Sequence, residues 1–206
     1  MTNHCWDKHR HQGCSFKTAS RTVMNSIGRK TIAEALKDWS LSIPSPVNRR
    51  AAPRWWSFRF FGFDVPCYNF EWRQQALAHH DLHHVVTGYP CTLFGEMQIA
   101  TWEFAAGRYP NAFATLFCLP LVALGALLIP RKAWSAFKYG RQCCSLFTTP
   151  ITAELLATSV DDLRIRIVRD PRSTGKLWDA ALFSLLVVQS ALLCSLPIWI
   201  WVAVSL

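Results

Sequence analysis

The sequence ends in a long apolar run, and this run limits the folds that the chain can adopt. No charged residue occurs from Ala180 to Leu206. As an α-helix this segment would be roughly 40 Å long at ~1.5 Å per residue, whereas the hydrocarbon core of a bilayer is about 30 Å thick. The sequence therefore predicts an apolar C-terminal membrane anchor, which we assign to residues 177–206.

The rest of the chain has the size of one domain. Of the 206 residues, 51% are hydrophobic and 17% are charged, a composition closer to membrane-associated proteins than to ordinary soluble ones. A chain of this length holds one sizeable core. We predict an all-α fold, with a bundle-like helical domain over residues 55–176. A basic, partly irregular segment over residues 1–54 precedes it and ends in a proline-punctuated linker.

The chain is basic, with a formal net charge of +9, and most of the excess lies in the first sixty residues. Such a segment can contact anionic lipid, nucleic acid or an import machinery. No nucleic-acid-binding motif accompanies the charge, so we expect membrane lipid as a partner and no nucleic acid. A transit peptide stays open as a second interpretation of the N-terminal segment.

Two helices joined by a short turn are predicted in the middle of the chain. The first is expected over about residues 67–86 and stops at Gly88, because glycine suits a helix C-cap and the residue before Pro90 avoids the helical region. The second begins near Thr92, an acceptable N-cap, and continues to about residue 106. The pair forms a helical hairpin.

A second apolar stretch, residues 111–130, follows this hairpin. Pro120 and Gly125 interrupt it, so the sequence leaves open both a membrane span and a buried or interfacial helix. The segment between the two apolar stretches is polar and positively charged. This charge predicts that the segment stays on the cytoplasmic or matrix-like side of a membrane.

Four of the seven histidines lie between residues 79 and 84. On a helix with ~100° per residue, Asp81 lies about 100° and His84 about 40° from His80, so these three share one arc. His79 and His83 point away from this arc; we expect His83 to be exposed, with a position behind the metal ligands, in support of them, as the alternative. The helical phase thus separates two histidines and an acid from two neighbouring histidines.

The selected residues can bind a metal ion. Two histidines at i and i+4 can direct ring nitrogens at one ion, and carboxylates supply oxygen ligands at a similar distance. Glu96 lies on the second helix, where the turn can fold it over His84. The predicted metal ligands and catalytic residues are His80, Asp81, His84 and Glu96, with one of the two carboxylates as an alternative base. An exposed polar helix face with incidental histidines is the competing interpretation.

Arg73 lies on the same helix face two turns before His80. It is a candidate clamp for a substrate carboxylate, and an ordinary surface cation is the alternative.

Two known motifs contain part of this string. The H-x-x-H-H box of membrane di-iron desaturases and hydroxylases matches "HDLHH", but that architecture needs further boxes and no histidine follows His84. An HD-type phosphohydrolase would use His80 and Asp81 with another histidine upstream and an aspartate well downstream, and here the upstream histidines lie in the irregular N-terminal segment. Neither motif agrees with the residues that the chain offers.

A third motif agrees over a longer stretch. The pattern from His80 to Glu96 resembles, position for position, the H-D-x-x-H-x11-E signature of the coenzyme Q (ubiquinone) biosynthesis protein 4 family. Similar elements follow in the family's order: P-x-[NT]-x-x-G-E from Pro90, the aromatic pair Trp102 and Phe104, and Gly140-Arg141 in the G-R-[RQ] position. The resemblance covers about residues 66–170.

This resemblance implies a helical protein that binds a divalent metal, usually zinc, and acts on polyprenylated hydroxybenzoate intermediates of ubiquinone biosynthesis. It implies a metal-dependent lyase, an oxidative decarboxylase that works at the membrane surface together with other quinone-biosynthesis enzymes. The predicted ligands by themselves suit Fe2+ as well as Zn2+.

A non-catalytic lipid-binding scaffold that organises these enzymes is the alternative function. The expected location is the cytoplasmic side of the bacterial inner membrane, or alternatively the matrix side of the mitochondrial inner membrane.

Overall fold

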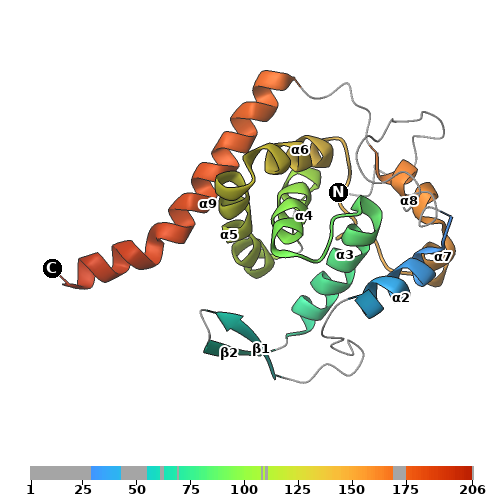
Figure 1. Ribbon diagram of the computed structural model, residues 1–206, viewed down its shortest axis with the longest axis horizontal. Coiled ribbons are helices and arrows are strands. Elements are labelled where there is room, and N and C mark those ends of the chain that lie inside the picture. Colours follow the sequence, from blue (N-terminus) through green and yellow to red (C-terminus); the bar gives the residue numbers. More distant parts are fainter. Residues whose placement is uncertain are drawn as a thin grey trace.

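Helices make up most of the described chain (Figure 1). The computed structural model describes residues 29–42, 55–60, 63–68, 70–107, 109, 111–168 and 175–205. The elements are α2 (Ile32–Ser42), β1 (Trp55–Phe60), β2 (Phe63–Tyr68), α3 (Glu71–Thr87), α4 (Leu93–Ala106), α5 (Ala112–Leu128), α6 (Pro130–Arg141), α7 (Ala153–Ala157), α8 (Val160–Ile167) and α9 (Lys176–Ser205). The predicted helical, bundle-like fold is confirmed, and a small β-hairpin is added to it.

The predicted helical hairpin is formed by α3 and α4. Gly88 ends α3 in the left-handed region, with φ 76°, and its N–H donates to the carbonyl of His84 at 2.8 Å. The side chain of Thr92 caps α4 by accepting from the N–H of Gly95 at 3.2 Å. Both ends of the turn therefore lie where the capping residues predicted them.

The expected start of the first helix is wrong by about four residues. Residues 63–68 form β2, which pairs antiparallel with β1, in a register that sets Trp55 opposite Tyr68 and Phe60 opposite Phe63. Aromatic and β-branched side chains favour extended backbone, and two six-residue strands separated by two residues fit a tight hairpin.

The core joins α2 to the helices that follow the linker. Thr31 and Glu34 form a reciprocal capping box at the start of α2, and the N–H of Ile32 donates to the carbonyl of Thr158 at 2.9 Å. Ile32 is fully buried in one cluster with residues of α3, α4 and α8. The predicted domain boundary follows residue 54, so α2 lies before this boundary although it packs against the helices after it. Expectations for residues 1–28 and 43–54 lie outside the described residues.

Close helix packing surrounds α4. A Cβ at Gly140 of α6 would lie 2.3 Å from the backbone oxygen of Trp102, so only glycine allows this approach of α6 to α4. On another side, Gly125 of α5 lies against Met97, the residue after Glu96. The helices α5 and α6 thus hold the helix that carries Glu96.

The C-terminal helix α9 is long and apolar enough to cross a membrane, and it is the one helix of the described residues that is. Its first turns pack on α6: Arg141 Nε lies 3.1 Å from the buried Asp179 Oδ1, and the ring of Phe183 lies 5.3 Å from that of Trp134. Farther along, α9 extends away from the other helices (Figure 1). With 17 residues, α5 is an apolar helix shorter than a span.

Candidate metal centre

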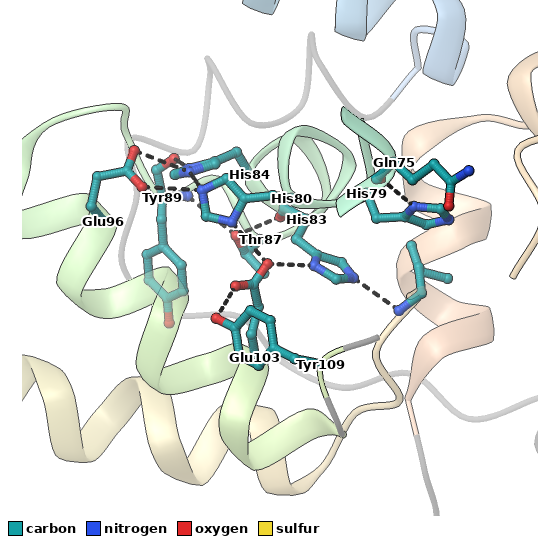
Figure 2. A network of polar contacts seen from close by, with 11 residues as sticks. Gln75, His79, His80, His83, His84, Thr87, Tyr89, Glu96, Glu103 and Tyr109 are labelled. Carbon is teal, nitrogen blue, oxygen red and sulfur yellow. Dashed lines mark hydrogen bonds and ion pairs between the residues drawn. The ribbon is translucent and has the colours of Figure 1, made fainter. Parts of the chain in front are cut away.

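Three side chains from α3 and α4 converge on one point (Figure 2). The Nε2 atoms of His80 and His84 are 3.1 Å apart. Glu96 Oε2 lies 3.1 Å from His80 Nε2, and Glu96 Oε1 lies 3.3 Å from His84 Nε2. These three residues can hold a metal ion. The helical hairpin therefore brings two histidines and one glutamate together in a cluster that can hold a metal ion.

The turn between the helices places Glu96 over the two rings. A Cβ at Gly95 would lie 1.8 Å from the carbonyl oxygen of Pro90, so a side chain at position 95 would push the turn away from α4. The N–H of Glu96 donates to the carbonyl of Thr92 at 2.8 Å in the first helical turn. The local sequence thus fixes the distance at which Glu96 faces α3.

Each ring has an acceptor on its outer nitrogen. His84 Nδ1 lies 2.8 Å from the carbonyl oxygen of Tyr89, and His80 Nδ1 lies 3.0 Å from Glu103 Oε1. A carbonyl oxygen only accepts, so His84 Nδ1 carries a proton. When each outer nitrogen holds the single proton of a neutral ring, both Nε2 atoms present lone pairs to each other and to a carboxylate.

Three electron-pair donors around one point need a positive charge between them, supplied by a proton or a metal ion. Ligand atoms at ~2.0–2.1 Å from a tetrahedral zinc ion lie about 3.3 Å apart. The observed separations of 3.1–3.3 Å match this spacing. The residues therefore fit a divalent metal.

One side of the cluster is partly open. The side chain of His84 is 1% exposed and stacks on Trp39 of α2 at 4.7 Å between ring centroids. The side chains of His80 and Glu96 are 19% and 26% exposed. A metal held by these three residues can therefore take a further ligand from outside the protein.

A buried carboxylate lies behind His80. Glu103 is fully buried, and its Oε1 lies 2.7 Å from His83 Nδ1 while its Oε2 accepts from the hydroxyl of Tyr109 at 2.5 Å (Figure 2). Burial alone would raise the pKa of Glu103, but the facing His80 and His83 rings outweigh burial and lower this pKa. Glu103 is therefore an ionised, fully hydrogen-bonded group beneath the site.

The same contacts act on the residues of the cluster. Burial favours the neutral ring of His80, but Glu103 and Glu96 overcome this and raise its pKa to about 10. Burial raises the pKa of Glu96, and the contacts with His80 and His84 reverse the shift and lower it. In the absence of a metal the cluster thus retains a proton at neutral pH.

Two predicted site residues lie outside the cluster. Asp81 is half-buried on α3 and is not among the three residues of the cluster. Three of the four predicted ligands are thus brought together, and the role of Asp81 as a ligand or base stays a prediction. Arg73 is half-buried two turns before His80, and its role as a clamp stays a prediction.

One of the two neighbouring histidines, His83, differs from expectation in its burial. His83 is fully buried, so the expectation of an exposed position is wrong; it packs between Glu103 and the ring of Phe147 at 4.8 Å. His79 is half-buried, and its ring nitrogens lie 2.9 Å from Gln75 O and 2.8 Å from Thr149 O. Both rings connect α3 to other parts of the chain.

The helical phase of the histidines did not predict Glu103 as a residue of the site. It lies seven residues after Glu96, two helical turns, so both carboxylates face α3 from the same side of α4. This spacing is the signal that could have identified it.

Comparisons of the chain with protein-family models, with curated proteins and with solved structures find no match. The resemblance to the coenzyme Q biosynthesis protein 4 family stays a prediction based on its motif.

Proposed function

We propose that this protein is a metal-dependent lyase of ubiquinone biosynthesis, which removes the carboxylate of a polyprenylated hydroxybenzoate oxidatively at a membrane surface. The arrangement of His80, His84 and Glu96 around one partly open point carries this proposal. Two histidines and one carboxylate are the ligands of many catalytic zinc sites, which keep a position for substrate, and they equally suit iron(II). The sequence motif supplies the substrate class.

The chemistry at such a site follows from its charges. A bound divalent ion would hold a carboxylate or phenolate oxygen of the substrate and stabilise negative charge as the carboxyl group leaves. The protein would contribute Glu96 and the two rings as ligands, and the ring of Trp39 stacks on that of His84. Asp81, beside His80, is the candidate base, and Arg73 the candidate clamp for the ring carboxylate.

Exposed apolar side chains support a substrate with a long lipid tail. Large side chains of α5 lie open to the surroundings, and α5 packs on α4 next to Glu96: Phe113, Leu116, Phe117, Leu127 and Leu128. Exposed Arg131 and Lys132 follow at the start of α6, where they can contact anionic lipid. We propose that the protein lies on the cytoplasmic side of a bacterial inner membrane, or on the matrix side of a mitochondrial one, near other quinone-biosynthesis enzymes.

The proposal is tested by Glu96→Gln, which keeps the size of the side chain and removes its charge. In cells that depend on this protein, the variant should remain folded and membrane-bound, yet the prenylated benzoate should accumulate and ubiquinone should fall to the level of a deletion. Glu154→Gln, at an exposed position of α7, is the matched control and should retain normal quinone. Normal quinone in cells with folded Glu96→Gln and His80→Ala variants would overturn the catalytic role in favour of a scaffold.

A further inference from the structure

We infer that Glu103 is a positioning residue of the metal site, which fixes the ring of His80 so that its Nε2 faces the ion. The inference rests on the metal site proposed above and assigns a role to a residue outside the predicted ligands. It follows from a chain of hydrogen bonds that begins at a backbone amide.

The first link fixes the ring of His83. The N–H of Leu146 lies 2.8 Å from His83 Nε2, and a backbone amide can only donate. His83 Nε2 therefore carries a lone pair, and the proton of the neutral ring is on Nδ1. This Nδ1 lies 2.7 Å from Glu103 Oε1, so His83 donates to the carboxylate. The ring is fully buried, so bulk solvent does not reach it.

The second link fixes Glu103 as an acceptor on both oxygens. Its Oε1 accepts from His83, and its Oε2 accepts from the hydroxyl of Tyr109 at 2.5 Å. His80 Nδ1 lies 3.0 Å from the same Oε1. A carboxylate with no proton of its own can only accept from that ring, so His80 Nδ1 is the protonated nitrogen.

The last link is the ligand atom. With its proton held at Nδ1, His80 directs the lone pair of Nε2 at the point shared by His84 Nε2 and Glu96. Histidine ligands in metal sites commonly donate their other N–H to a carboxylate or a carbonyl, and losing this partner typically weakens metal binding about 10- to 100-fold. Glu103 also brings a second negative charge to the cluster, which balances the charge of a dication together with Glu96.

The two histidine ligands are held in different ways. His84 Nδ1 is held by the carbonyl of Tyr89, a backbone group that no substitution removes. His80 Nδ1 is held by a side chain, so a mutation that touches no ligand can remove this hydrogen bond. Glu103 thus offers a way to alter the site without touching a ligand.

The test compares Glu103→Gln with the wild-type full chain in detergent micelles, with zinc affinity measured by competition with a chelator. The amide bears no charge, and of its two ends only the oxygen can accept, so its hold on the N–H of His80 is weaker and zinc should bind about 10- to 100-fold more weakly. The visible spectrum of bound cobalt(II) should change as well, because the ligand field depends on the orientation of His80. Glu154→Gln, at an exposed position of α7, makes the same change of side chain away from the site and serves as the control; it should stay within about threefold of wild type.

Unchanged zinc affinity and an unchanged cobalt spectrum in folded Glu103→Gln would overturn the inference. If the wild-type protein itself binds no metal, the proposed metal site fails instead, so the two failures are distinguishable. A second measurement does not depend on the folding of a variant: nitrogen NMR of ¹⁵N-histidine in the zinc-bound wild-type chain. His80 and His83 should each show a protonated Nδ1, and a protonated Nε2 at either ring would overturn the inference.

Discussion

At the level of single residues, His80 has a carboxylate on each side of its ring, and this arrangement makes metal binding depend on pH. The pKa of His80, about 10, means that the metal-free ring holds an extra proton at neutral pH. A metal ion must displace this proton from Nε2. We expect release of about one proton for each ion bound at pH 7 to 9, with an apparent affinity that rises about tenfold per pH unit and levels off above about pH 10.

Titration calorimetry in buffers of different ionisation enthalpy checks this prediction, because the observed heat should vary with the buffer by the enthalpy of one proton. Heats that do not depend on the buffer would contradict it.

The contrast between His84 and His79 gives a second prediction at this scale. His84 belongs to the cluster, whereas the ring nitrogens of His79 contact the carbonyl oxygens of Gln75 and Thr149, outside the cluster. Elemental analysis of purified protein should find about one zinc or iron ion per chain in the wild type and in His79→Ala, and none in His84→Ala. Equal metal content in the two variants would show that the cluster does not bind the ion.

Helical phase predicted part of this site from the sequence. The 40° between His80 and His84 placed them on one face, and the turn brought Glu96 to them. The same reasoning failed for His83 because it assumes one buried face, whereas every residue of α3 from 82 to 87 is buried between different neighbours. Which face of α4 meets α3 is a property of packing, so Glu103 did not follow from the pattern near the histidines.

At the level of elements, the turn between α3 and α4 limits the site most. Gly95→Ala places a methyl group against the carbonyl of Pro90, which cannot yield without moving the turn. We expect a loss of about 1–3 kcal/mol in stability, typical of overpacking at a close contact, together with weaker metal binding as Glu96 shifts. Gly175→Ala is the control, because its Cβ would meet no atom within 4 Å. Thermal unfolding in detergent, with and without zinc, measures both effects, and equal melting temperatures for the two variants would contradict the prediction.

Helix ends that are marked by capping residues were predicted well. Gly88 and Thr92 mark the turn of the helical hairpin by local chemistry alone, and α4 begins and ends where it was expected. The start of α3 was misplaced because residues 63–68 pair with a strand that precedes them, and such pairing depends on distant backbone. The burial of α2 likewise depends on Thr158 and Val160, more than a hundred residues away.

At the level of the whole molecule, α9 is the described helix that is long and apolar enough to cross a membrane, and we predict that it anchors the chain there. The full-length chain should resist extraction from membranes by alkaline carbonate. A double variant with Leu185→Lys and Leu192→Lys, both exposed on α9, should be extracted to a large extent, because a lysine within a bilayer costs about 2.5–3.5 kcal/mol near the centre of a span. Ile165→Lys, at an exposed position of α8, is the control and should remain in the membrane. Resistance of the double variant to carbonate would argue against insertion of α9.

The ion pair of Arg141 with Asp179 and the contact of Phe183 with Trp134 join α9 directly to α6. Through Gly140, α6 in turn packs on α4, which bears Glu96. In the proposed membrane-bound state, this series of packed contacts sets the height of the metal ligands above the lipid boundary. Substrates whose ring lies at that height above their lipid tail would then reach the ion, whereas substrates with a longer or shorter spacing between ring and tail would not.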